Sequence, residues 1–161
     1  MKITVLCIGR RSQEDYISAV QTYTDRLQGS YKLSWVLLAS CALEPTKAKQ
    51  IESDAIRAKL KPNDTTWLLD ERGQQISSPE LSSKLQTLKN TGISRLVIII
   101  GGAYGVDDSL RNSVTWQWSL SKLVFPHQMV RLILAEQLYR ADQIDRGSAY
   151  HHALVYLSVT D

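Results

Sequence analysis

Hydrophobic residues follow two different spacings in turn along the first half of the chain. Short apolar runs, typical of strands, cover three segments: residues 3–8, 31–38 and 65–70. Between these runs, apolar side chains recur every three or four positions, as they do on one face of a helix. The first helix is expected to include Tyr16 to Leu27 and to stop at Gly29. A second is expected over residues 47–60, because Pro62 cannot continue it.

The next stretch predicts a polar turn and then a helix with clear ends. The turn is expected at residues 71–73, where it would end the third strand. Ser78 is the candidate N-cap, and Pro79 fits the first helical position. Three leucines at helical spacing form the expected buried stripe: Leu81, Leu85 and Leu88. Residues 90–92, Asn-Thr-Gly, are expected to end the helix.

Residues 96–100 are Leu-Val-Ile-Ile-Ile, an apolar run without alternation. Such a run is typical of a parallel strand that helices cover on both faces. Because strands and helices alternate, the sequence predicts an α/β fold, with residues 1–161 forming one domain. The last third predicts three more features: a short helix over residues 107–112, a short strand and loop within 114–125, and a long helix over 126–144.

The long helix carries apolar side chains around an unusually wide arc. Four of them share one face: Val130, Leu134, Leu138 and Ala141. Met129, Leu132 and Ile133 lie on neighbouring faces. This width favours burial on two sides, one against the sheet and one against another chain. A core helix in a monomer is the alternative, but a domain of this size would cover such a helix poorly, so we expect a dimer.

Composition and charge are typical of a cytoplasmic globular protein. The chain is 43% apolar and 22% charged, and its formal net charge of +3 suits a polyanionic partner without identifying one. No apolar run approaches the ~20 residues that span a bilayer, and the N-terminus lacks a signal-peptide cleavage site, so we expect no membrane association. Cys7 and Cys41 have no zinc-type spacing, so we expect no metal, and no disulfide in a reducing compartment.

Glycines follow the buried strand at the place where parallel sheets bind ligands. The run Gly-Gly-Ala-Tyr-Gly occupies residues 101–105, and glycine lets a ligand approach the backbone closely. No Gly-Lys-Ser/Thr follows, and the Gly-x-Gly-x-x-Gly pattern is absent, so the run indicates neither a phosphate loop nor a dinucleotide fingerprint. A site for a nucleotide-like ligand is one interpretation, and a plain tight turn is the other.

A second candidate segment, residues 119–128, joins an apolar loop to the start of the long helix. Backbone groups in this loop could hold an adenine and its ribose. His127 lies in the first helical turn, where the helix dipole disfavours the imidazolium, so we expect a neutral ring. A lone histidine serves more often in capping or stacking than in catalysis, and both roles stay open.

Charged and aromatic residues gather toward the end of the chain. Glu136 and Arg140 are four residues apart, and a solvated ion pair on the helix surface is the simplest interpretation. Tyr150, His151 and His152 follow one another, and no further metal ligands lie at suitable spacing. Contact with RNA bases or phosphates is one interpretation of this trio, and an ordinary surface tail is the other.

Taken in order, five segments resemble the RlmH family, which methylates 23S ribosomal RNA and belongs to the SPOUT superfamily. The segments are GGAYG (101–105), WSLSK (118–122), FPHQMVR (125–131), EQLYRA (136–141) and GSAYH (147–151). With the opening MKIT, the similarity covers nearly the whole chain. The resemblance implies a parallel sheet flanked by helices with a C-terminal trefoil knot, which periodicity alone does not predict.

The resemblance also implies the reaction and its participants. The cofactor would be S-adenosyl-L-methionine, and the methyl acceptor N3 of a pseudouridine in 23S rRNA, within the ribosome or the large subunit. The enzyme would act as a homodimer, with the tail of one subunit near the cofactor site of the other. Eight positions match the family's cofactor contacts: Leu69, Gly101, Leu120, Ser121, Lys122, Leu123, Val124 and Phe125.

On the substrate side, three residues are expected to be catalytic: His127, Tyr150 and His151. Which of them takes the proton from N3 stays open. Arg131 and Arg140 are expected to contact RNA or to hold the dimer. His152 stands where family members usually end in a basic residue, which makes 153–161 an extension. Two alternatives remain, namely a SPOUT enzyme acting on another RNA such as tRNA and a non-catalytic ribosome-binding module.

Overall fold

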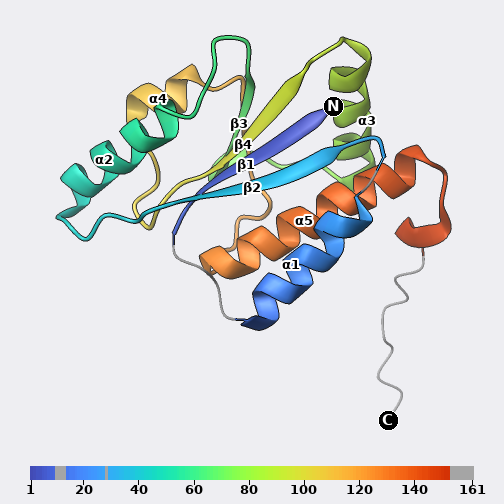
Figure 1. Cartoon of the computed structure of the whole chain (residues 1–161), viewed down its shortest axis with the longest axis horizontal. Coiled ribbons are helices and arrows are strands. Elements are labelled where there is room, and N and C mark those ends of the chain that lie inside the picture. The colour runs from blue at the N-terminus through green and yellow to red at the C-terminus, as the bar shows by residue number, and fades with distance from the viewer. Residues whose placement is uncertain (10–13, 28, 153–161) are drawn as a thin grey trace.

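The computed structural model describes residues 1–9, 14–27 and 29–152, and strands alternate with helices throughout this part (Figure 1). The elements are β1 (Lys2–Ile8), α1 (Glu14–Arg26), β2 (Lys32–Leu38), α2 (Pro45–Arg57), β3 (Thr65–Gln74), α3 (Ser78–Asn90), β4 (Arg95–Ile100), α4 (Asp108–Ser113), β5 (Trp116–Trp118), α5 (His127–Asp145) and the 3₁₀ turn η1 (Ala149–His151). The predicted α/β class is confirmed. The expected extension, residues 153–161, lies outside the described residues.

The strands form one parallel sheet in the order β2-β1-β4-β3-β5. β4 lies in the middle, with Cys7 of β1 and Leu69 of β3 both paired with Ile100. Because the strands are parallel, their carboxyl ends meet at one edge of the sheet. Ligands of α/β proteins bind beyond this edge.

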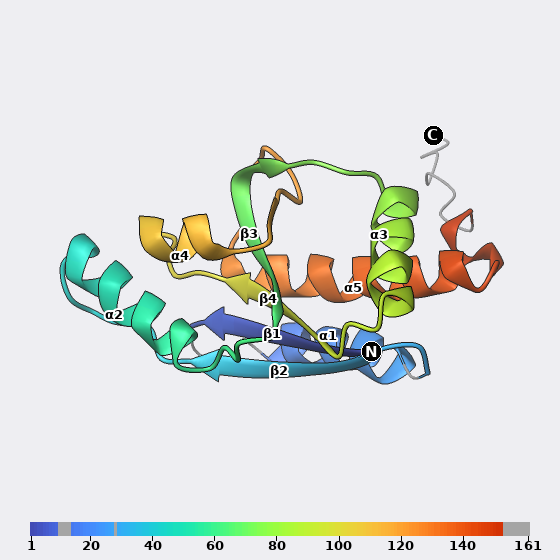
Figure 2. The ribbon, with the colours of Figure 1, turned by 90° about the horizontal axis from the view of Figure 1, so that it is seen from above.

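Helices cover both faces of the sheet, as Figures 1 and 2 show. α1, α3 and α5 pack on one face, while α2 and α4 pack on the other. Successive residues of β4 therefore enter different cores, with Ile98 in the first and Ile99 in the second. Both side chains are fully buried, and each such burial contributes about 1.5–3 kcal/mol. The prediction that this strand is covered on both faces is confirmed.

The turn expected at residues 71–73 is wrong, because β3 continues through this segment to Gln74. After an irregularity that follows Leu69, the strand pairs again with β5 at Trp118. Gly73 permits this pairing, since a Cβ there would come within 2.7 Å of the Gln117 carbonyl and the Trp118 nitrogen. The polar residues that resemble a turn in sequence are the exposed end of a long strand.

The N-cap of α3 is Ser77, one residue before the expected Ser78. Its hydroxyl accepts a hydrogen bond from the Glu80 N–H (3.3 Å), and the Glu80 carboxylate accepts one from the Ser77 N–H (2.7 Å). This reciprocal pair is a capping box. Ser78 instead donates from its hydroxyl to Gln137 of α5 (2.6 Å).

Removing this cap is expected to weaken the protein measurably. We expect Ser77→Ala to lower the free energy of unfolding by about 1 kcal/mol, because the Glu80 N–H in the first turn loses its acceptor. Ser83→Ala is the matched control, since Ser83 is an exposed serine within the same helix. Denaturant unfolding measures both variants. Equal stability of the two would contradict a role for the box.

The long helix α5 packs against the sheet and has α1 and α3 on its flanks. Its expected apolar face is largely buried, with Leu134 and Leu138 at 0% exposure. The Ser82 hydroxyl of α3 donates to the Ala141 carbonyl (2.8 Å) and fixes the two helices together. Three further apolar residues stay half-buried: Met129, Leu132 and Ile133. α1 and α3 therefore cover part of the wide apolar arc.

Candidate active site

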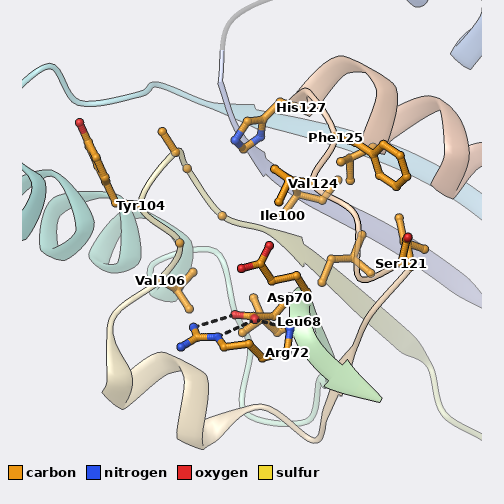
Figure 3. A pocket seen from close by; sticks show the side chains of 18 of the residues that line it. Leu68, Asp70, Arg72, Ile100, Tyr104, Val106, Ser121, Val124, Phe125 and His127 are labelled. Carbon is orange, nitrogen blue, oxygen red and sulfur yellow. Dashed lines mark hydrogen bonds and ion pairs between the residues drawn. The ribbon is translucent and has the colours of Figure 1, made fainter. Parts of the chain in front are cut away.

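A cavity of about 390 Å³ opens at the carboxyl edge of the sheet (Figure 3). Its walls come from three stretches far apart in sequence: residues 68–72 of β3, residues 100–106 after β4, and the loop before α5. Figure 3 shows Asp70 and Arg72 on one side, with Ser121 and Phe125 across from them. The two segments that the sequence marks as candidates thus meet around one space.

Most of the residues expected to bind the cofactor line this cavity. Seven of the eight do so: Leu69, Gly101, Leu120, Ser121, Leu123, Val124 and Phe125. Lys122 is exposed and is not part of the wall. Leu123 and Val124 are 70% and 80% exposed, which is unusual for apolar side chains next to a cavity. A bound molecule or a second chain would cover them.

The turn after β4 folds so tightly that side chains are excluded from it. The Gly105 N–H donates to the Gly102 carbonyl (3.0 Å), and Gly105 has a φ of 75°, which favours glycine. A Cβ on Gly101 would come 3.1 Å from the Gly105 carbonyl carbon. A Cβ on Gly102 would overlap the carboxylate of Glu52. The glycines therefore serve internal packing as well as leaving backbone open to the cavity.

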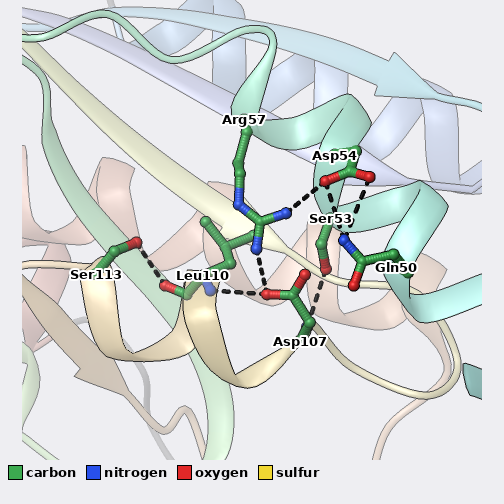
Figure 4. A network of polar contacts seen from close by, with 7 residues as sticks. All are labelled: Gln50, Ser53, Asp54, Arg57, Asp107, Leu110 and Ser113. Carbon is green, nitrogen blue, oxygen red and sulfur yellow. Dashed lines mark hydrogen bonds and ion pairs between the residues drawn. The ribbon is translucent and has the colours of Figure 1, made fainter.

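Helix α2 holds this turn in place through a polar network (Figure 4). The Asp107 carboxylate accepts hydrogen bonds from Arg57 and from the Leu110 N–H, and the Asp107 N–H donates to Ser53 (2.9 Å). The hydrogen bond from Arg57 lowers the pKa of Asp107, so the carboxylate is charged at neutral pH. Next to Ser53 on α2, the buried carboxylate of Glu52 accepts a hydrogen bond from the Cys41 N–H (2.8 Å).

Sequence reasoning missed these residues of α2. Polar positions in a helix resemble a solvated face, and no spacing rule distinguishes Glu52 from its exposed neighbours.

The polar side of the cavity is built on Asp70. Its carboxylate accepts hydrogen bonds from Arg111 and from both the side chain and the backbone of Arg72. Although burial opposes it, these hydrogen bonds lower the pKa of Asp70, which is therefore an anion at neutral pH. The cavity thus has a charged side and an apolar side, which suits a ligand that is itself part polar and part apolar.

Known proteins resemble this chain over most of its length. A family model described as "Predicted SPOUT methyltransferase" matches residues 1–151. A protein of Geotalea daltonii is 40% identical over 156 residues, covering 94% of this chain and 100% of that protein. One of Christiangramia forsetii is 36% identical, covering 94% and 99%. Both are named Ribosomal RNA large subunit methyltransferase H. The chain belongs to the RlmH family of SPOUT methyltransferases.

In this methyltransferase, His127 is the one expected catalytic residue that lines the cavity. It lies in the first turn of α5, as predicted, and its Nδ1 is buried without a hydrogen-bond partner among the described residues. Burial lowers the pKa of His127, the Arg131 charge lowers it further, and the nearby Glu52 opposes the shift. The imidazole is therefore neutral at pH 7, as expected. The sequence offered the helix dipole as the reason, and the structure adds burial and the charge of Arg131.

Arg131 lies one turn further along α5 and is 5% exposed. Its Nε donates to the Cys7 sulfur at 3.0 Å. Gly9 leaves room for the guanidinium, because a Cβ there would come 2.7 Å from Nη2. Burial raises the pKa of the Cys7 thiol, although Arg131 opposes the shift.

Tyr150 and His151 lie near the other end of α5, away from the cavity in their own chain. Tyr150 packs beside Glu136 and Arg140, which are 9 and 13 residues after His127, so it lies about 14–20 Å along the helix from the first turn of α5 at 1.5 Å per residue. Arg140 lies 4.9 Å from the Tyr150 ring, and it donates to Glu136 (2.9 Å) and to the His151 carbonyl (3.5 Å). The prediction of a solvated Glu136–Arg140 pair is wrong, because the Arg140 side chain is only 5% exposed.

Two kinds of feature are absent from the described part of this SPOUT protein. No group of three or more histidine, cysteine or acidic side chains that could hold a metal ion occurs in residues 1–9, 14–27 and 29–152. Over the same residues, no helix is both long and apolar enough to cross a membrane. His152 is exposed, and its ring lies 5.2 Å from that of His151.

Proposed function

We propose that this protein transfers a methyl group from S-adenosyl-L-methionine to N3 of a pseudouridine in the 23S rRNA of the large ribosomal subunit. One observation supports this above all. The glycine turn at 101–105 and the loop at 120–125 line a single cavity at the carboxyl edge of the sheet. The names of the relatives support the class of substrate.

The residues around the cavity suit this methyl donor. Leu120, Val124 and Phe125 offer apolar surface to an adenine, and the backbone near Gly101 offers polar groups to a ribose. Asp70 and Arg111 lie on the charged side, where the donor's ammonium and carboxylate groups would find opposite charges. When bound, the donor supplies an already activated methyl group, so the protein's task is to position the acceptor and to accept a proton.

The proton on N3 needs an acceptor that is unprotonated at neutral pH. Burial raises the pKa of Tyr150, and hydrogen bonding and the nearby Glu136 raise it further, so its phenol keeps its proton. The neutral imidazole of His127 can accept one, and it lines the cavity. We therefore assign proton acceptance to His127 and leave Tyr150 and His151 to orient the substrate.

The position of these groups supports a homodimer, which is part of this proposal. Tyr150 and His151 pack beside Glu136 and Arg140 and do not line the cavity of their own chain, so in this proposal they act on a methyl donor that is bound in another copy. The half-buried Met129, Leu132 and Ile133, together with the exposed Leu123 and Val124, offer apolar surface for that contact. In this arrangement Arg140 holds the tail, and His152 faces the RNA.

We also propose the C-terminal trefoil knot and a cytoplasmic location. The path of the chain is compatible with threading. β5 pairs with β3, and the following loop returns past the glycine turn before α5 begins on the opposite face of the sheet from α4. Ribosomes as the substrate place the enzyme in the cytoplasm.

The deciding experiment is methyl transfer to ribosomes that carry an unmethylated pseudouridine. Wild type is expected to transfer methyl groups to them, and His127→Ala to lose at least 100-fold in kcat because the proton acceptor is gone. Tyr150→Phe is the comparison, with a loss below about tenfold, since it keeps the ring beside Arg140. Methylation of tRNA with ribosomes untouched would indicate a different RNA substrate. Absence of calorimetric affinity for the donor would indicate a ribosome-binding module.

A further inference from the structure

A second, smaller cavity of about 210 Å³ adjoins the first. It lies at the ends of β1 and β2, and the first turns of α5 close it. Its lining residues are Ile8, Gly9, Ser40, Gly102, Ala103, His127, Gln128 and Arg131. Gly102, Ala103 and His127 line both cavities, so the two spaces meet at these three residues.

The second cavity presents hydrogen-bonding groups of both kinds. The Arg131 guanidinium forms part of the wall, held by Cys7 and packed against Gly9. Ser40 and Gln128 contribute an uncharged hydroxyl and an amide. His127, neutral at pH 7, adds an Nδ1 atom that has no hydrogen-bond partner among the described residues.

A buried carboxylate supports two of the walls. Glu52 is 4% exposed, and its Oε1 accepts a hydrogen bond from the Cys41 N–H, directly after Ser40. Its Oε2 packs against Gly102 and has no partner within the described part of the chain. At His127 the charges of Glu52 and Arg131 act in opposite directions, so the surroundings favour an uncharged ligand over an RNA phosphate.

We propose that the second cavity receives the target base, an uncharged pyrimidine, and so places it beside the methyl donor in the first cavity. This inference rests on the function proposed above. The imide edge of the base presents one N–H between two carbonyl oxygens, and the wall offers an acceptor in His127 together with donors in Gln128 and Arg131. Methyl transfer also requires the acceptor atom within about 3–3.5 Å of the methyl carbon, so in this proposal the base and the donor meet at the residues that both cavities share.

The test fills the second cavity without touching the first. Ser40→Leu adds bulk to a residue that lines only the second cavity, and Ala42→Leu adds similar bulk at an exposed position of the same loop. For Ser40→Leu we expect at least a tenfold loss of kcat/KM on ribosomes with unmethylated pseudouridine. Its calorimetric affinity for S-adenosyl-L-methionine should stay within twofold of wild type. Ala42→Leu should match wild type in both measurements.

Each other outcome has a distinct meaning. If wild type itself leaves ribosomes unmethylated, the proposed function fails. If wild type is active and Ser40→Leu behaves like Ala42→Leu, the base does not enter this cavity. Loss of donor affinity in Ser40→Leu would also overturn the inference, because the two cavities would then serve one ligand.

Discussion

Replacing Gly102 with alanine is expected to abolish binding of S-adenosyl-L-methionine and to lower the free energy of unfolding by about 1–3 kcal/mol. The added methyl group would overlap the Glu52 carboxylate and come 2.9 Å from its Cδ. Glu52 cannot withdraw cheaply, because it is buried and accepts the Cys41 N–H. The turn must then move, and it forms a wall of the cavity. Calorimetry and denaturant unfolding measure the two effects.

Two variants separate this overlap from other effects of alanine. Gly92→Ala adds a methyl group where no atom lies within 4 Å, although the φ of 77° is unfavourable for alanine. It should lose about 1 kcal/mol and bind the donor normally. In the double variant Glu52→Ala/Gly102→Ala the overlap is gone, so its loss of unfolding free energy should be smaller than the sum of the two single losses. Simple additivity would rule out the overlap as the cause.

The fold could be predicted from the sequence wherever the local hydrophobic pattern agrees with the burial of the residues in the structure. Residues 96–100 are apolar without interruption, and the structure places them in the strand covered on both faces. The pattern failed at residues 71–73, where polarity indicated a turn but β3 continues to Gln74, which pairs with β5. It also misplaced the α3 cap by one residue, because Ser77 and Ser78 both satisfy the cap preference and only Glu80 at the third helical position decides between them.

Some residues of the candidate site could also be predicted from local patterns, and others could not. Glycines after a buried strand mark a ligand site by local rules, and Gly101 does line the cavity. Asp70 and Arg111 are 41 residues apart, and their pairing depends on where β3 and α4 lie in the fold. Glu52 acts on Gly102 across 50 positions of sequence. Periodicity contains no information on such contacts, so the residues that shape the walls became visible only in three dimensions.

Removing the Glu136 carboxylate is expected to destabilise the protein by about 3–5 kcal/mol, since it leaves a buried guanidinium without its ion pair. Arg140 is 4% exposed, and Glu136 is its partner on the same helix. Glu136 also accepts the hydrogen bond of the Tyr150 hydroxyl (3.4 Å), so the tail should lose its fixed position as well. Glu136→Ala should therefore lose methyl transfer to ribosomes while still binding the donor. Neither Glu136 nor Arg140 lines the first cavity.

The comparison that isolates burial is Asp54→Ala. Asp54 also pairs with an arginine, Arg57, but its side chain is 59% exposed, so the loss should stay below about 1 kcal/mol. The double variant Glu136→Leu/Arg140→Met removes both buried charges and should regain much of the stability lost in Glu136→Ala, without regaining activity. Recovered activity in that variant would mean that the pair only stabilises the fold. A stable double variant that still lacks methyl transfer would mean that the charged pair positions Tyr150 and His151 for the RNA.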